Sequence, residues 1–160
     1  MTATGFGALA SKRLAVTMSL RRLGSRVTNE DQALPVVLLV EDEVLIRLVT
    51  AEGLGLLGYD VVEAGTVRDG LARLRESAGS IRAAVVDIGL PDGKGDDLAL
   101  TIRREMPDIA VIVASGYGDN GLKTRFGADP MMRVLSKPYQ PEDIDALLRE
   151  LTTVRPVPQV

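Results

Sequence analysis

The sequence predicts an α/β domain, a doubly wound parallel sheet of five strands with helices on both faces. Short apolar runs recur along the chain and are typical of strands buried on both faces. Segments with helical apolar spacing lie between these runs, so that strand and helix alternate five times. This alternation requires right-handed crossovers between parallel strands, which place helices on both faces of the sheet. The 160 residues are enough for one domain with its own core.

Each expected element has a local signature of apolar spacing bounded by turn or capping residues. The strands are expected at 36–40, 60–64, 83–87, 109–114 and 131–135. The helices are expected at 44–57, after a capping box formed by Thr66 and Asp69, at 96–106, as a short and poorly held helix within 117–130, and from Pro141 onward.

The first predicted helix carries apolar residues and two internal glycines. Its buried side is expected to hold Leu45, Leu48, Val49 and Leu56. Gly53 and Gly55 are unfavourable inside a helix, so close packing is expected to require them. In the later helices the residues expected to face the core are Leu98, Ile102, Ile144, Leu147, Leu148 and Leu151.

The regular pattern predicts a domain at 34–152, with an extension at 1–33 and a tail at 153–160. The extension is basic, and its apolar stripe consists of Leu9, Val16, Leu20, Leu23 and Val27. Two interpretations stay open: an amphipathic helix that meets a partner or membrane surface, or a poorly ordered leader without a function. We favour the leader, because Gly24 weakens the helix and Met18 is an alternative start. The extension lacks the apolar region of a secretory signal.

The composition excludes several classes of site. The chain has no cysteine and no histidine, which excludes disulfides, Cys/His zinc sites and histidine acid–base chemistry. Any metal would therefore be a hard cation held by oxygen atoms. The net charge of −3 offers no broad surface for direct contact with nucleic acid, and no apolar run approaches the length of a membrane span. We expect a cytoplasmic protein.

Chemically active side chains follow four of the five predicted strands, namely Glu41 and Asp42, Asp87, Ser115, and Lys137. The carboxyl ends of parallel strands lie at the same edge of a sheet, where such folds bind ligands. The strand that ends at Asp87 is expected beside the first strand, so that three carboxylates gather there. A divalent cation relieves their mutual repulsion, and Mg²⁺ favours a site with one or two carboxylates and several waters.

This set of groups fits phosphoryl transfer. An aspartate such as Asp87 is a competent nucleophile toward phosphorus and forms an aspartyl phosphate. Mg²⁺ and Lys137 would supply positive charge, while the Ser115 hydroxyl and loop amides would supply hydrogen bonds. Glycoside hydrolysis fits less well, because its two carboxylates require no lysine.

Taken singly, these residues have simpler interpretations. Asp87 and Ser115 are common turn residues, and Lys137 is a solvated lysine at a strand end. Glu43 is interpreted as an acid at a helix start that complements the helix dipole, and Tyr139 as a packing residue. It is the occurrence of all the site residues in one chain that favours a functional site.

Four motifs, in this order and at suitable spacing, resemble the receiver domain of two-component response regulators. They are LLVEDE at 38–43, VDIGLPDG at 86–93, ASG at 114–116 and SKPY at 136–139. The resemblance runs from about Val36 to Leu151. It implies a flavodoxin-like (βα)5 fold with strand order 2-1-3-4-5.

The resemblance also implies a role for each acidic residue of the predicted site. Asp87 would be the phosphoacceptor. Asp42 would bind Mg²⁺ directly, and Glu41 would do so directly or through water. The backbone carbonyl of Gly89 would complete the metal shell.

The resemblance implies that Ser115 is the switch hydroxyl that moves to the phosphoryl group, with Lys137 as the ion partner of that group. The chain has Val134 where many family members carry an aromatic residue whose rotation reports phosphorylation. The segment 115–118 (SGYG) instead resembles a subset, common in alphaproteobacterial systems, that lacks this aromatic. Tyr117 is then either the moving ring or a shield over the phosphoryl group.

The leading hypothesis is a stand-alone receiver, a monomer or weak homodimer, phosphorylated by a histidine kinase or a histidine phosphotransfer protein. It would signal by protein contact through its last two helices and the strand between them, or drain a kinase as a phosphate sink. It would catalyse only its own phosphorylation and dephosphorylation. One alternative is a pseudo-receiver that docks partners without being phosphorylated. Another is an aspartate-nucleophile phosphatase, which is disfavoured because such sites usually need an acid where this chain has Gly89.

Overall fold

The computed structural model describes residues 34–77, 79–116 and 120–153. Within them, five parallel strands form one sheet in the order β2-β1-β3-β6-β7. These strands are β1 (Val36–Val40), β2 (Asp60–Ala64), β3 (Ile81–Asp87), β6 (Ala110–Ser115) and β7 (Met132–Ser136). The predicted flavodoxin-like order 2-1-3-4-5 is confirmed.

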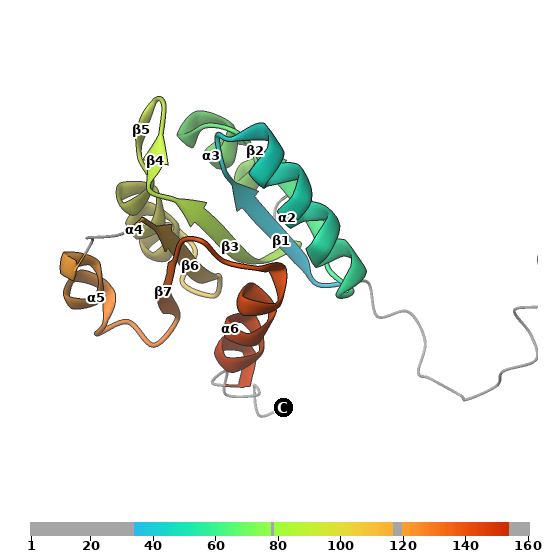
Figure 1. The fold of residues 1–160 in the computed structure, drawn as a ribbon. Helices are drawn as coiled ribbons and strands as arrows, with labels where there is room; N and C mark the ends of the chain where they lie inside the picture. Colours follow the sequence, from blue (N-terminus) through green and yellow to red (C-terminus); the bar gives the residue numbers. More distant parts are fainter. Residues whose placement is uncertain (1–33, 78, 117–119, 154–160) are drawn as a thin grey trace, which may run out of the picture. The chain divides into compact units, whose positions relative to one another are not determined.

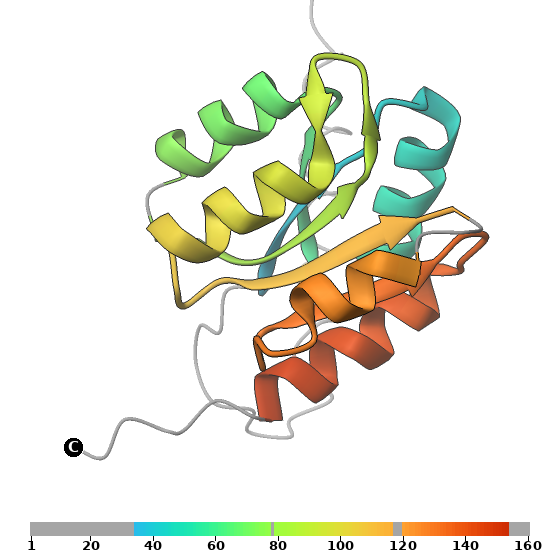
Figure 2. The same cartoon turned by 90° about the vertical axis from the view of Figure 1, so that its left-hand side faces the viewer.

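Helices cover both faces of this sheet (Figures 1 and 2). In the described part of the chain they are α2 (Val44–Leu56), α3 (Val67–Glu76), α4 (Gly95–Glu105), α5 (Asn120–Phe126) and α6 (Pro141–Thr153). The buried side chains of α2 and α6 pack in the cluster on one face, and those of α3, α4 and α5 pack in the cluster on the other. The seven residues of α5 make it the short helix that the sequence predicts.

Alternation along the strands sends neighbouring side chains into different clusters. In β1, Val37 and Leu39 pack on the face covered by α2 and α6, whereas Leu38 and Val40 pack on the other face. All four are at most 1% exposed, which confirms a strand buried on both faces. None of the helices in the described part of the chain has both the length and the apolar character that crossing a bilayer requires.

The first helix, α2, buries a different face from the one predicted. The four residues predicted to be buried are instead exposed, with exposed fractions of 77% for Leu45, 52% for Leu48, 64% for Val49 and 85% for Leu56. The buried residues are instead Thr50 and Leu54, one helical turn apart. Apolar residues surround almost the whole circumference of α2, so helical spacing alone does not identify its inward face.

The two glycines of α2 differ in their surroundings. A Cβ atom on Gly53 would lie 2.3 Å from Cγ of Pro141, at the start of α6, so the predicted close packing is confirmed there. A Cβ atom on Gly55 would meet no heavy atom within 4 Å, so the same prediction is wrong for Gly55.

A two-stranded antiparallel hairpin follows β3, between the strand predicted at 83–87 and the helix predicted at 96–106. Its strands are β4 (Gly89–Leu90) and β5 (Gly93–Lys94), and it projects beyond the sheet at the end of β3 (Figure 1). The Asp92 carboxylate accepts hydrogen bonds from the backbone N–H groups of Val67 and Arg68 at 2.7 and 3.0 Å. These bonds tie the hairpin to the first turn of α3, where Thr66 caps the Asp69 N–H as predicted.

Three sequence predictions lie outside the described residues. They concern the amphipathic stripe of the 1–33 extension, the role of Tyr117 and the tail beyond Thr153.

Candidate functional site

The strand register brings the predicted site residues to one edge of the sheet. Val40, which precedes Glu41, pairs with Val86, which precedes Asp87. On the other side of β3, Asp87 pairs with Ala114, which precedes Ser115. Lys137 follows β7, the next strand along. The prediction that the first strand neighbours the strand of Asp87 is confirmed.

Three carboxylates meet at this edge. One oxygen atom each from Glu41, Asp42 and Asp87 lies within 4.8 Å of the others. Glu41 and Asp87 are buried, with exposed fractions of 1% and 7%, whereas Asp42 is exposed. The cluster therefore opens to solvent on the side of Asp42.

The lysine at the end of β7 bridges two of these acids. Lys137 Nζ lies 2.8 Å from Asp87 Oδ1 and 3.1 Å from Glu41 Oε2. The second carboxylate oxygen of Glu41, Oε1, accepts a hydrogen bond from the Glu43 backbone N–H at 3.2 Å. One ammonium group thus compensates part of the negative charge of the cluster.

Burial and pairing shift the pKa values of the bridged groups. Burial raises the pKa of Glu41 above 4.5, although the hydrogen bond from Lys137 opposes the rise. Burial lowers the pKa of Lys137, but its bonds to Asp87 and Glu41 outweigh this effect and raise the pKa to about 12. Lys137 is therefore fully charged at neutral pH.

The donor set fits a magnesium ion. All three side chains offer hard carboxylate oxygens, and the exposed side of Asp42 leaves room for the water ligands that Mg²⁺ retains. A Cβ atom on Gly89 would lie 3.5 Å from Asp87 Oδ2, so the backbone of residue 89 passes beside this carboxylate. The use of the Gly89 carbonyl as a ligand stays a prediction.

Ser115 and Lys137 are held together by the backbone. Ser115 is 3% exposed, and its carbonyl accepts a hydrogen bond from the Lys137 N–H at 2.7 Å. The bond between Lys137 and Pro138 is cis. Tyr139, predicted as a packing residue, packs against the cluster of α2 and α6.

One residue of the site escapes the sequence analysis. Gly95 begins α4, and its N–H donates to the Ile88 carbonyl at 3.1 Å. A Cβ atom on Gly95 would lie 1.8 Å from the carbonyl oxygen of Asp87, so only glycine fits here. The signal in the sequence is the second glycine of GKG at 93–95, immediately before the helix predicted at 96–106.

The comparison with known families decides between the possible meanings of this site. A family model of the response regulator receiver domain matches residues 37–149. The chain belongs to this family. The receiver domain thus spans most of the predicted 34–152 domain. The strand order and the acidic cluster are those that the resemblance to receivers implies.

Curated relatives of this receiver are longer proteins. The chain is 31% identical over 115 residues to the sensor kinase CckA of Brucella abortus (strain 2308), covering 72% of this chain and 12% of that protein. It is 32% identical over 114 residues to the photosynthetic apparatus regulatory protein RegA of Rhodovulum sulfidophilum, covering 71% of this chain and 61% of that protein. The receiver spans less than two thirds of either relative.

Solved structures of receivers have the same fold. The receiver domain protein (CheY-like) of Methanospirillum hungatei JF-1 matches with a TM-score of 0.64 and 29% identity, covering 76% of this chain and 96% of that one. The receiver domain of the hybrid histidine kinase CckA matches with a TM-score of 0.58 and 26% identity, covering 72% of this chain and 98% of that one.

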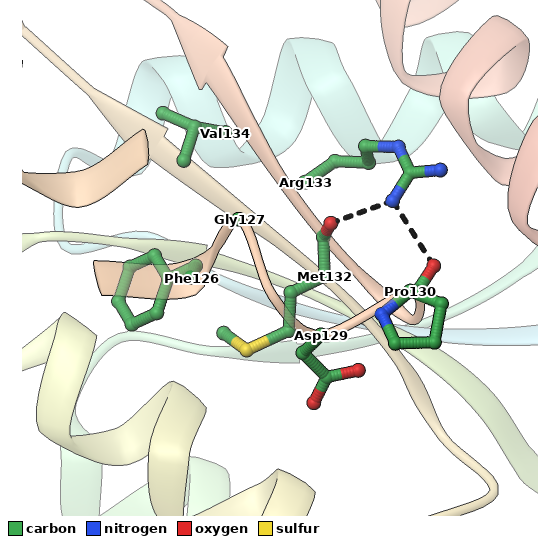
Figure 3. A pocket seen from close by; sticks show the side chains of 7 residues that line it. All are labelled: Phe126, Gly127, Asp129, Pro130, Met132, Arg133 and Val134. Atoms are coloured by element: carbon green, nitrogen blue, oxygen red, sulfur yellow. Dashed lines mark hydrogen bonds between the residues drawn. The ribbon is translucent and has the colours of Figure 1, made fainter. Parts of the chain in front are cut away.

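A pocket lies away from the carboxylates, along α5 and β7. Phe126, Met132 and Val134 line a pocket of about 490 Å³, and the Arg133 side chain turns back to the carbonyls of Pro130 and Met132 (Figure 3). Val134 is half-buried here, at the position where the resemblance implies an aromatic residue in many receivers.

Proposed function

We propose that this chain is a response-regulator receiver that accepts a phosphoryl group on Asp87 in a magnesium-dependent reaction. The observation that carries the proposal is the Lys137 ammonium bridging Asp87 and Glu41 beside an acidic cluster that fits a cation. A docking module that is never phosphorylated has no need of such a site, and we retain the pseudo-receiver only as the alternative.

The acceptor chemistry follows from the positions of these groups. A carboxylate oxygen of Asp87 bonds to phosphorus as the bond between phosphorus and a donor histidine nitrogen breaks, and the electron pair leaves with the imidazole. The partner, a histidine kinase or a histidine phosphotransfer protein, supplies this histidine because the chain has none. Mg²⁺ held by Glu41, Asp42 and Asp87 would neutralise charge on the phosphoryl oxygens. Lys137, whose Nζ lies 2.8 Å from Asp87 Oδ1, contributes a fixed positive charge.

An exposed apolar surface of this chain lies next to the site and is suited to docking of the phosphodonor protein. The exposed apolar face of α2 consists of Val44, Leu45, Leu48, Val49 and Leu56. A hollow of about 540 Å³ lies between α2 and the segment from Lys137 to Pro141, so the face and the site adjoin. A donor protein that covers this face with apolar side chains brings its phosphohistidine close to Lys137 and Asp87.

The signal then leaves by protein contact in the cytoplasm, or the chain acts as a phosphate sink. We assign the outgoing contact to α5, β7 and α6, because α5 has only seven residues and is the next described element after β6, which ends at Ser115. We infer no enzymatic activity on other substrates, only catalysis of its own phosphorylation and dephosphorylation.

A mass measurement tests this function. The intact chain is incubated with Mg²⁺ and acetyl phosphate, and we expect a mass increase of one phosphoryl group that is lost in the Asp87→Asn variant. Absence of the adduct in the wild-type chain would favour the pseudo-receiver. Rapid multiple turnover of the phosphodonor would favour a phosphatase.

A further inference from the structure

We propose that Arg47 is a positioning residue that holds the loop between β1 and α2 in the shape that its metal-binding carboxylates require. Arg47 lies in the first helical turn of α2. The inference rests on the proposed magnesium-dependent function, and it concerns how the chain prepares the site before the metal binds.

The guanidinium of Arg47 contacts the loop through its backbone. Nη1 donates to the carbonyl oxygen of Glu41 at 2.5 Å and lies 3.5 Å from that of Asp42. Nε lies 3.4 Å from Oε2 of Glu63, on the neighbouring strand β2. The Arg47 side chain is only 18% exposed, so it is held in this arrangement by its surroundings.

These contacts constrain the two residues that carry the carboxylates. Fixing the carbonyls of Glu41 and Asp42 restricts the peptide units immediately after β1, and so restricts where both side chains leave the backbone. Because Arg47 binds backbone oxygens, the carboxylate oxygens near Asp87 are left for a cation. Lys137 acts differently, since it binds the carboxylates of Glu41 and Asp87 themselves.

Gly65, which follows β2, leaves room for the guanidinium of Arg47 because it has no side chain. A Cβ atom on Gly65 would lie 3.1 Å from Arg47 Nη1 and 3.8 Å from Cζ. Gly65 does not have a positive φ, so alanine is compatible with the backbone there. The variant Gly65→Ala therefore displaces the guanidinium while Arg47 and all the carboxylates stay in the sequence.

The matched substitution is Arg47→Lys, which keeps the positive charge but removes the planar group that reaches two carbonyls and Glu63 together. The same substitution on the exposed surface of α4, Arg104→Lys, is the control, because the Arg104 side chain is 73% exposed. If Arg47→Lys lowers the affinity for Mg²⁺ and Arg104→Lys does not, the loss is due to the geometry of the Arg47 side chain and not to net charge.

The test is calorimetric titration of the full chain with Mg²⁺, without a phosphodonor. We expect Arg47→Lys to bind Mg²⁺ roughly 10- to 100-fold more weakly, the range typical of groups that orient metal ligands. Gly65→Ala should weaken binding in the same direction, Arg104→Lys should leave it unchanged, and the double variant Arg47→Lys/Gly65→Ala should lose less than the sum of the two single effects. At saturating Mg²⁺, phosphorylation of Arg47→Lys by acetyl phosphate should return to the wild-type rate.

The outcomes separate this inference from the function on which it rests. If the wild-type chain binds no Mg²⁺, the proposed function itself fails. If the wild-type chain binds Mg²⁺ and both Arg47→Lys and Gly65→Ala bind it equally well, the role of Arg47 is overturned. Circular dichroism without metal shows whether each variant folds, and if Arg47→Lys does not, the affinity of Gly65→Ala decides.

Discussion

At the scale of single residues, the site is built from groups whose partners determine their protonation and position. Glu41 and Asp87 are buried in a sheet edge, and one lysine compensates them. Lys137 can do this at any physiological pH, because its pKa is about 12. A cation bound at this cluster would mainly offset the negative charge that Lys137 leaves uncompensated.

Tyr59 gives a prediction of pH dependence far from the acidic cluster. Its hydroxyl donates to Asp145 Oδ1 at 2.7 Å, and burial together with Asp145 raises the pKa of Tyr59 from 10.0 to about 12. The folded state therefore keeps this proton between pH 10 and 12 while the unfolded state loses it. We expect the free energy of unfolding to fall as the pH rises through this window.

The comparison variant is Tyr59→Phe, followed by denaturant unfolding at several pH values. It should be less stable than wild type at neutral pH and should show a shallower fall above pH 10, where the ordinary pKa lies. An equally steep fall in Tyr59→Phe would contradict the assignment.

The two glycines of α2 predict opposite effects of the same substitution. Gly55→Ala adds a methyl group in open space and should raise the free energy of unfolding by up to about 1 kcal/mol, because alanine is the better helix former. Gly53→Ala forces the methyl group against Pro141 and should lower it by about 1–3 kcal/mol. Thermal unfolding of both variants checks the sign. Equal shifts would show that the α2–α6 contact is not as close as described.

At the scale of elements, α5 is anchored to α4 by an ion pair. Arg125 of α5 binds the carboxylate of Asp96 in α4 and lies 3.0 Å from Asp97 Oδ1. Asp96 is 8% exposed, and its Oδ1 has no hydrogen-bond partner among the described residues. The buried carboxylate thus depends on the guanidinium of Arg125.

Removing this guanidinium should loosen α5. We expect Arg125→Gln to destabilise the domain by about 1–3 kcal/mol and to speed amide hydrogen exchange in α5, because it leaves a buried charge without its cation. Adding Asp96→Asn should recover part of the loss, since the buried group is then neutral. If exchange in α5 does not change, the anchor has no role in the stability of this helix.

The apolar face of α2 gives a prediction about the phosphodonor. Leu48→Glu and Val49→Glu place a charge on a surface that is already exposed, so folding should be preserved. Phosphotransfer from a histidine phosphotransfer protein that serves the wild-type chain should slow at least about tenfold, or about 1.4 kcal/mol. Leu34→Glu is the control, since Leu34 is also exposed but precedes β1, away from the carboxyl ends of the strands.

The small phosphodonor separates docking from chemistry. Acetyl phosphate should label Leu48→Glu and Val49→Glu at the wild-type rate, because it does not use the α2 face. A parallel loss with both donors would place the defect in the acceptor site instead.

The sequence predicts strands better than helix faces, and the reason is physical. Strands buried on both faces are continuous apolar runs, and their ends carry the acids and the lysine, so the edge of the sheet is predictable from Asp42, Asp87 and Lys137. The inward face of α2 is not predictable, because apolar residues lie around most of this helix. Which of them are buried depends on how the helix surface fits its neighbours. Its fit on α6 is set by Gly53 against Pro141, a contact between residues far apart in the chain.

Other contacts cannot be predicted from the sequence either, because they also join residues that are not neighbours in the chain. The approach of Gly95 to the Asp87 carbonyl and the link from Asp92 to α3 depend on how the β4–β5 hairpin folds over the sheet edge. A local pattern records the turn residues but not the backbone that they approach. Such contacts hold the segment that follows Asp87 in place.

At the scale of the whole molecule, we expect the carboxylate cluster to couple metal binding to folding. A ligand that binds the folded chain and not the unfolded chain stabilises it by mass action, by about 2.7 kcal/mol at a concentration of 100 times its Kd. Glu41 and Asp42 lie in the loop that follows β1, and Asp87 ends β3, so the three carboxylates converge only in the folded sheet. Mg²⁺ should therefore raise the unfolding temperature of the entire domain and not of one segment.

Differential scanning calorimetry with and without Mg²⁺ measures this coupling. We expect a single transition that moves upward with Mg²⁺ concentration in the wild-type chain and does not move in Asp42→Asn. Without metal, Asp42→Asn should be at least as stable as wild type, because it removes one of three mutually repelling charges. Asp97→Asn, which changes an exposed aspartate in α4, is the matched control and should retain the shift. A metal-dependent shift of equal size in Asp42→Asn would mean that the cation binds elsewhere on the chain.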